Sequence, residues 1–311
     1  MPHPSSHHRV TAPKHTPGFT RRRFLASLGM LSGAAALVPL VSRTRAPRMA
    51  SVEAGRPMLG TWVRIVARDP DDRRAQRAIE RAFAAIREVD FQMSAHRADG
   101  DLARVNRAAG ESAVRVPTAL LDVVASACSN AERTQGVYDP TVLPLMRLYG
   151  FSGGHAQSRP VTRAIDEALE RVDFRGVTVD RPGSTIALAR RGAGLDLGSI
   201  GKGWAVDRAV DALREEGVRS GLVDAGGNIY GLGVPEDGAD GWNVGVLHPV
   251  TGVTAGLFSL RDAAVATSGN HERFVTIDGL RSGRLFAACR GVPVDGHLSV
   301  AVMAQTAVDA D

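Results

Sequence analysis

The chain has 311 residues, of which 44% are hydrophobic and 23% charged, an ordinary composition for a globular protein with one large or two smaller domains. Its net charge of +5 misleads, because residues 1–50 hold eight Lys and Arg residues and no acid, which leaves about −3 for the remainder. The composition therefore gives no basic footprint for nucleic-acid binding.

Residues 1–50 are predicted to be a leader and spacer, ahead of a single domain over residues 51–311. The run Thr20-Arg21-Arg22-Arg23-Phe24-Leu25 matches the twin-arginine export pattern, and an apolar stretch of about 18 residues follows. That stretch suits a signal region better than a stable membrane span. We expect export by the twin-arginine route to the periplasm or the outer face of the cytoplasmic membrane. An uncleaved segment would keep the protein near the membrane, and an amphipathic tail is the alternative.

Hydrophobic periodicity predicts strands and helices in irregular alternation along the rest of the chain. Thr118 is a candidate cap near the start of one helix, and Gly217 is a candidate cap at the end of another. The expected strands are 60–67, 176–179, 185–189, 221–225, 242–247 and 256–260, and the expected helices are 72–92, 100–107, 117–133, 163–172 and 202–217. Because the order lacks a clean βαβ rhythm, the sequence favours an α+β fold over a doubly wound sheet.

The segment from Leu195 to Asp207, LDLGSIGKGWAVD, is the most informative one. It predicts a short apolar strand, a glycine-rich turn and an amphipathic helix. Glycines and a helix N-terminus favour a bound anion, and Lys202 adds a positive charge where a phosphate would lie. Asp196 can accept hydrogen bonds from a base or sugar, or help to hold a divalent cation. An ordinary β–α connection with a solvent-facing lysine is the alternative, because short glycine motifs are weak signals.

Four further segments carry polar groups that could contact a ligand. His96 lies in the polar run 93–106 and can stack on a ring, while 136–142 offers the carboxylate of Asp139. The double glycine in 223–229 allows close approach of a ligand or forms a β-bulge. Small hydroxyl residues in 266–270 could hold phosphate oxygens. For the first, second and fourth segments, an ordinary loop or turn is the alternative.

In this order, and together with Met58-Leu59-Gly60-Thr61, the segments resemble the FAD:protein FMN transferase family, the ApbE-type flavin transferases. The resemblance runs from about residue 55 to the end. It implies an α+β fold, with a T-fold-like mixed sheet and helix architecture and a smaller appended α/β region. It also implies an enzyme that binds FAD, transfers FMN to a threonine of an acceptor flavoprotein and releases AMP, with Mg²⁺ bridging the phosphates.

The resemblance implies roles for particular residues. Asp196 and Lys202 would be the catalytic pair, in contact with the nucleotide and the pyrophosphate. The carbonyl of Ser199 and the carboxylate of Asp311 would bind the metal. The remaining cofactor-binding positions would be Met58, His96, Val137, Tyr138, Asp139, Thr267, Ser268 and Gly269.

The sequence also departs from the family pattern. His96 stands where an aromatic residue, often Tyr, is usual, and Gly100 replaces a usual serine. Residues 284–293, RLFAACRGVP, lack the His and the Asp-Pro of a loop that helps to close the flavin site. The family continues past the position of Asp311 with a threonine metal ligand and a helix and strand. Two hypotheses follow, an active transferase and a degenerate relative that binds FAD without transfer, with a structural domain that binds neither FAD nor Mg²⁺ as a distant third.

Overall fold

The computed structural model describes residues 49–152, 159–236, 238–269, 274–277, 280–283, 285–294 and 299–311. Almost all of the predicted leader over 1–50, with its export motif, lies outside these residues. Within the described part of the chain, no helix combines the length and apolar character needed to cross a bilayer.

An antiparallel sheet of six strands is central to the described residues, in the order β1-β2-β6-β7-β10-β15. Its first two strands form a hairpin in which Met58 pairs with Thr61 across Leu59 and Gly60, which both have positive φ. The strands are β1 (Ala50–Met58), β2 (Thr61–Asp69), β6 (Ser220–Ala225), β7 (Asn228–Leu232), β10 (Ala263–Gly269) and β15 (Ser299–Ala304).

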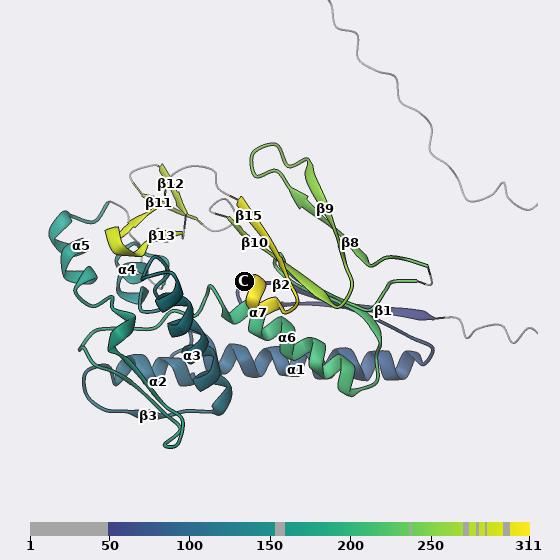
Figure 1. The fold of residues 1–311 in the computed structure, drawn as a ribbon, viewed down its shortest axis with the longest axis horizontal. Coiled ribbons are helices and arrows are strands. Elements are labelled where there is room, and N and C mark those ends of the chain that lie inside the picture. The colour runs from purple at the N-terminus through teal and green to yellow at the C-terminus, as the bar shows by residue number, and fades with distance from the viewer. Residues whose placement is uncertain are drawn as a thin grey trace, which may run out of the picture. The chain divides into compact units, whose positions relative to one another are not determined.

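Two long helices, α1 (Asp72–Met93) and α6 (Gly201–Glu215), pack together on one face of this sheet (Figure 1). The main hydrophobic core lies there, where Phe83 of α1, Val206 of α6 and Ile65 of β2 are fully buried. Burial of side chains of this size stabilises a fold by about 1.5–3 kcal/mol each. The short helix α7 (Ala307–Ala310) contacts α6 on the same side.

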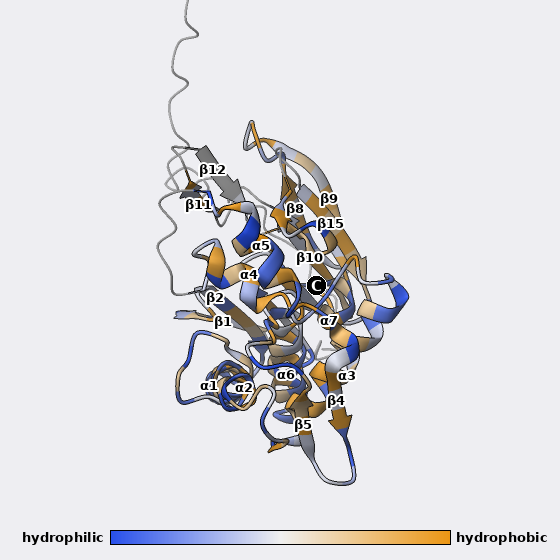
Figure 2. Ribbon diagram, turned by 90° about the vertical axis from the view of Figure 1, so that its left-hand side faces the viewer, coloured by the Kyte–Doolittle hydropathy of each residue, from blue (hydrophilic) through white to orange (hydrophobic). Residues whose placement is uncertain are grey.

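A β-hairpin covers part of the opposite face of the sheet. It consists of β8 (Trp242–Leu247) and β9 (Thr254–Leu260), and its buried Val244 and Leu260 pack with Val66 and Val265 of the main sheet. Figure 2 shows hydrophobic residues concentrated in the strands and hydrophilic residues on the outer turns of the helices. The sheet is therefore buried on both faces over its central strands.

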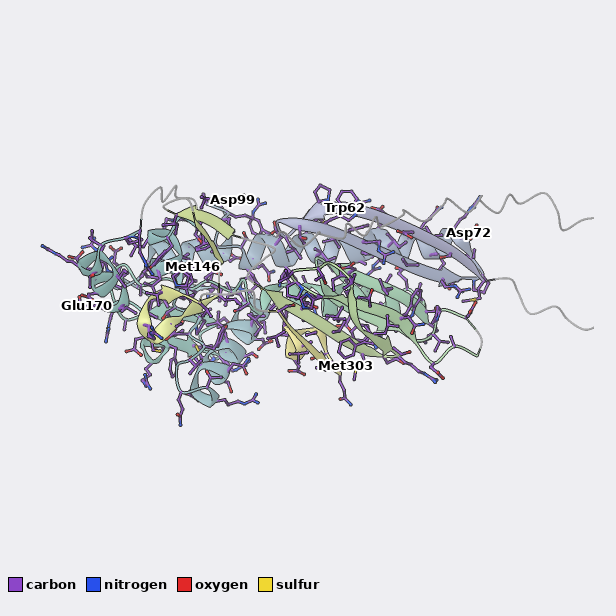
Figure 3. All side chains as sticks on the ribbon, turned by 90° about the horizontal axis from the view of Figure 1, so that it is seen from above. Trp62, Asp72, Asp99, Met146, Glu170 and Met303 are labelled. Carbon is purple, nitrogen blue, oxygen red and sulfur yellow. The ribbon has the colours of Figure 1, made fainter. Side chains whose placement is uncertain are left out.

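A second group of elements contains four helices and several short strands among the described residues. A small sheet in the order β3-β5-β4 and an aromatic contact of Tyr149 with Phe286 help to hold this group together. Figure 3 marks Met146 of α4 in this group and Met303 on the strand β15. Its elements are α2 (Asp101–Arg107), β3 (Val114–Arg115), α3 (Thr118–Arg133), α4 (Leu143–Leu148), α5 (Thr162–Leu169), β4 (Val177–Asp180), β5 (Thr185–Leu188), β11 (Phe274–Ile277), β12 (Leu280–Gly283), β13 (Phe286–Ala287) and β14 (Val292–Pro293).

Two local predictions are wrong. The strand expected at Leu195–Leu197 does not form. The backbone of Leu195 bonds to a side chain of α2, and the Asp196 amide bonds to the Pro140 carbonyl, so no ladder forms. The side chain of Asn106 accepts from the Leu195 amide at 2.7 Å and donates to the Leu195 carbonyl at 3.0 Å. Thr118 does not cap its helix either: Pro117 is the N-cap, and no side chain makes the cap hydrogen bond.

Candidate nucleotide site

Two cavities meet at the turn that precedes α6. We call them the Tyr138 cavity, of about 240 Å³, and the His96 cavity, of about 390 Å³. Asp196, Gly198 and Lys202 line both, so this one turn forms a wall between them. The Tyr138 cavity is also lined by Thr61, Val137, Asp139, Val142, Met146, Ser199, Gly226, Thr267, Ser268, Gly269, Leu285, Phe286, Ala288 and Asp311. The His96 cavity is also lined by Leu59, Gly60, Val89, Asp90, Met93, Ser94, Ala95, Arg97, Leu197 and Gly201.

The shared turn is held by hydrogen bonds on both sides of Asp196. The Asp196 amide donates to the Pro140 carbonyl at 2.8 Å, and its Oδ1 accepts from the Gly198 amide at 2.8 Å. Helix α6 then begins at Gly201, and its N-cap residue Ile200 offers no side-chain cap. The positive end of the helix dipole therefore lies beside both cavities, where it favours an anion.

The carboxylate of Asp311 supplies the missing cap of α6. Its Oδ2 accepts from the Gly203 amide at 2.8 Å, and its Oδ1 lies 3.0 Å from Nζ of Lys202. The Asp311 side chain is 2% exposed and that of Lys202 is 23% exposed, so the ammonium is the solvent-facing member of the pair. Gly203 makes this approach sterically feasible, because a Cβ there would lie 2.3 Å from the Ala307 carbonyl oxygen.

Tyr138 forms the polar part of the cavity that carries its name. Its hydroxyl accepts a hydrogen bond from the Ser199 Oγ at 3.3 Å. Burial raises the pKa of the Tyr138 phenol to about 12. The phenol is therefore neutral at physiological pH and can act as a hydrogen-bonding group, but not as a base.

Asp139 has a structural task that the sequence did not reveal. Its Oδ1 accepts from the Thr141 amide at 2.8 Å and the Thr141 hydroxyl at 2.6 Å, and its Oδ2 accepts from the Phe174 amide at 3.1 Å. These bonds tie the chain before α4 to the segment before β4. Asp139 also lines the Tyr138 cavity, and a direct contact with FAD stays a prediction.

The small polar residues at the end of β10 do reach the Tyr138 cavity. Thr267, Ser268 and Gly269 line it together with Thr61 of β2. The first glycine of the double-glycine motif is explained by packing: Gly226 has φ +61°, and a Cβ there would lie 2.2 Å from the Thr61 Oγ1. Gly226 and Gly227 form the turn between the paired strands β6 and β7, and both have positive φ, so a close approach of a ligand to this motif stays a prediction.

Met58 does not line either cavity. It ends β1 and packs, partly buried, against the main core. The three residues that follow it do line the cavities, Leu59 and Gly60 on the His96 side and Thr61 on the Tyr138 side. Contact of Met58 itself with FAD therefore stays a prediction, and its neighbours are the better candidates.

Arg97 is a cavity residue that the sequence interpretation missed. It lies beside His96, forms an ion pair with Asp99 at 2.9 Å, and stacks over Phe91 with its guanidinium carbon 5.4 Å from the ring centroid. Its position next to His96 in the motif was the available signal. Leu285 and Phe286 were also missed as apolar lining of the Tyr138 cavity.

The predicted metal residues lie in one cavity. Ser199 and Asp311 both line the Tyr138 cavity, while no group of three or more His, Cys, Asp or Glu residues suited to a metal occurs in the part of the chain that is described. Mg²⁺ commonly takes one or two carboxylates and completes its shell with water and substrate phosphates. A single carboxylate and a backbone carbonyl that line the same cavity therefore suit Mg²⁺ bound together with a phosphate, and the metal-binding role of Ser199 and Asp311 stays a prediction.

Comparison with known proteins decides the family. The model of the ApbE family matches residues 59–311, which include the shared turn and both cavities. The chain belongs to the ApbE family. The FAD:protein FMN transferase of Treponema pallidum is 35% identical over 250 residues, covering 75% of this chain and 68% of that protein. The FAD:protein FMN transferase of Vibrio cholerae is 31% identical over 248 residues, covering 78% of this chain and 72% of that protein.

Solved structures of the ApbE family share the fold. The ApbE protein of Thermotoga maritima matches with a TM-score of 0.78 at 30% identity, over 84% of each chain. The flavin transferase ApbE from Vibrio cholerae matches with a TM-score of 0.75 at 26% identity, over 85% of this chain and 84% of that one. The predicted ApbE-like α+β fold is therefore confirmed, and the named relatives are enzymes.

Proposed function

We propose that the protein transfers FMN from FAD to a threonine hydroxyl of an acceptor flavoprotein and releases AMP. The observation that carries the proposal is the pair of cavities that share Asp196, Gly198 and Lys202 as a wall. FAD has a ring system at each end and a pyrophosphate between them, so each cavity would take one half and the pyrophosphate would cross the wall. The names of the curated relatives support the transfer of FMN from FAD to a protein.

The pyrophosphate would lie against Lys202 and the start of α6. The ammonium and the positive end of the α6 dipole favour its negative charge, and Lys202 is one of only two lysines in the chain. In the transfer, the threonine oxygen forms a bond to the FMN phosphorus, the bond from that phosphorus to the AMP oxygen breaks, and the hydroxyl proton is released. Positioning and charge neutralisation supply most of the catalysis in phosphoryl transfer.

Mg²⁺ would be held by Asp311 and the carbonyl of Ser199. When bound, it would neutralise phosphate charge that Lys202 alone cannot balance. The chain's own part is to keep the Asp311 carboxylate in place, which the bonds from Lys202 and the Gly203 amide do. Thr267 and Ser268 offer hydroxyl groups to the same cavity.

A second candidate function is FAD binding without transfer. The described part of the loop expected to close the flavin site contributes Leu285, Phe286 and Ala288 to the Tyr138 cavity, all apolar. No histidine occurs among the described lining residues of that cavity, and the phenol of Tyr138, with a pKa of about 12, is a poor proton acceptor at neutral pH. These observations favour a site that has kept FAD and that has neither a histidine nor an ionised tyrosine, among the described residues, to accept the threonine proton, which leaves the carboxylates of Asp139, Asp196 and Asp311 as the candidate acceptors.

The deciding experiment is incubation of the full chain with FAD, Mg²⁺ and an acceptor flavoprotein, followed by the mass of the acceptor. Addition of one FMN, lost when the acceptor threonine is replaced by alanine, supports the transferase. Binding of FAD without any mass increase supports the second candidate. A protein whose melting temperature does not respond to FAD would contradict both, because a ligand of the native state must stabilise it.

We further propose that the protein is exported by the twin-arginine route and meets its acceptor outside the cytoplasm. The support is the sequence motif Arg21-Arg22-Arg23-Phe24-Leu25 and the apolar stretch after it. Replacing Arg21 and Arg22 by lysine should retain the protein in the cytoplasm on cell fractionation. Unchanged export of that double variant would contradict the proposal.

A further inference from the structure

Helix α7 is capped by a residue of another helix. Asp207 lies in the second turn of α6, and its two carboxylate oxygens accept from the first two amides of α7, those of Ala307 at 2.8 Å and Val308 at 2.9 Å. The first amides of a helix have no partner within it, so this is a bidentate cap supplied from outside. The hydroxyl of Thr306, the helix's own N-cap residue, accepts from the Asp309 amide, which is the third amide of the helix.

At the opposite end of α7, a carboxylate in turn caps the start of α6. Asp311 follows α7 directly, and its carboxylate accepts from the Gly203 amide in the first turn of α6. Gly203 and Asp207 are one turn apart on α6, and Ala307 and Asp311 are one turn apart at α7. The two helices thus run antiparallel, and each places a carboxylate on the N-terminal amides of the other.

The burial of α7 cannot account for its position by itself. The helix has four residues, and its buried side chains are Ala307 and Ala310, which bring one methyl group each. A single helical turn is unstable in isolation, so its place depends on the bonds made to it. Burial raises the pKa of Asp207, which makes a carboxylate at this position costly and favours a specific task for it.

We propose that Asp207 is a positioning residue for Asp311. By capping α7 it holds the Asp311 carboxylate against Lys202 and the Gly203 amide, and so sets the cation-binding end of the site. This inference rests on the proposed function for its consequence in Mg²⁺ binding. Its structural part, the dependence of the Asp311 contact on Asp207, can be tested without any ligand.

The test uses hydrogen exchange of backbone amides, measured by NMR on the full chain. Asp207→Ala should speed exchange of the Gly203 amide, at the other end of the contact, by about fivefold, as expected for the loss of a helix cap. Asp207→Asn keeps one acceptor oxygen, so it should give a smaller increase and provides a milder variant if the alanine variant fails to fold. The matched control is Asp211→Asn on the same helix, which loses only exposed pairs with Arg208 and Arg214.

A second readout concerns the metal. In Asp207→Asn, the rise in melting temperature given by FAD alone should stay close to that of the wild type, while the extra rise on adding Mg²⁺ with FAD should shrink. The Asp211→Asn variant should respond to both as the wild type does. An equal loss of both increments would contradict a role through Asp311 and indicate a general effect on the site.

Two results separate this inference from the proposed function. If Ala307 and Val308 lose protection in Asp207→Ala while Gly203 does not, Asp311 is held independently and the inference is overturned. If Gly203 exchange responds as expected but the wild-type protein binds no FAD, the positioning contact stands and the proposed function fails.

Discussion

Nζ of Lys202 lies 3.0 Å from Oδ1 of Asp311, although 109 residues separate the two in the chain. The pair joins the start of α6 to the residue after α7 at the wall of the Tyr138 cavity. The ammonium of a lysine is a compact charge on a flexible stem, so it can contact either the carboxylate or a phosphate at this position. An arginine would present a broader planar group with fixed donor directions.

Lys202→Ala should weaken FAD binding by about 1–3 kcal/mol, because a charge-assisted phosphate contact is lost. Lys202→Arg should recover only part of that loss, since the guanidinium does not match the geometry of the ammonium. Isothermal titration calorimetry with FAD measures both. Wild-type affinity in the alanine variant would rule out the proposed phosphate contact.

Asp196→Asn tests the other residue of the shared wall. The asparagine Oδ1 can still accept from the Gly198 amide, so the turn should keep its shape. Loss of the charged acceptor should weaken FAD binding by about tenfold, while the urea midpoint of unfolding stays nearly constant. If affinity is unchanged and only stability responds, Asp196 is a structural residue and does not contact the ligand.

Two glycines two residues apart should respond oppositely to alanine. At Gly203 a Cβ would lie 2.3 Å from the Ala307 carbonyl oxygen, so Gly203→Ala should destabilise the fold by about 1–3 kcal/mol. At Gly201 nothing lies within 4 Å of such a Cβ, and Gly201→Ala should be neutral or stabilise by up to about 1 kcal/mol. Urea denaturation of the two variants checks this, and equal effects would contradict the close packing of α7 on α6.

Asn106→Ala should destabilise the protein by about 2 kcal/mol or more. It removes both side-chain bonds to Leu195 and leaves that residue's amide and carbonyl without these partners. Asn106→Asp keeps the acceptor for the Leu195 amide but places a charged oxygen against the Leu195 carbonyl in place of the donor, so it should destabilise the protein at least as much as the alanine variant. Chemical unfolding ranks the three proteins, and a different order would mean that Leu195 is held by other contacts.

Asp224→Asn should change the pH dependence of stability. Burial raises the pKa of Asp224 above its usual value near 3.8, so the folded state binds this proton more tightly than the unfolded state. The contribution of Asp224 to the free energy of unfolding is therefore fully present below about pH 4 and declines as the pH rises through the raised pKa. The variant lacks this decline, so its free energy of unfolding should increase relative to that of the wild type as the pH rises from 4 to 7. Parallel curves would indicate that the pKa of Asp224 is not raised.

The sequence predicted the elements whose hydrophobic pattern is long and regular. The helix expected at 72–92 is α1, and the strand expected at 60–67 is β2. Burial of one face imposes a period that can be read in the residues themselves. The strand β1 and the short helices α4 and α7 were not predicted, because their alternation is weak or their length is too small to show a period.

Contacts that depend on tertiary structure could not be read from local pattern. Leu195–Leu197 is as apolar as a strand, but Asn106, 89 residues earlier, takes the place of a neighbouring strand. Family motifs did indicate Lys202 and Asp311 separately. Their contact, and the use of Asp139 as a structural acceptor, required the three-dimensional arrangement.

The wall shared by the two cavities has a consequence for the order in which products leave. On the proposed function, the bond that breaks lies over that wall, so AMP and the FMN now bound to the acceptor threonine would lie in separate chambers after the transfer. AMP could then leave without displacing the flavin, and free AMP and free FMN could be bound at once. Inhibition studies should then find that AMP and FMN each compete with FAD but not with one another.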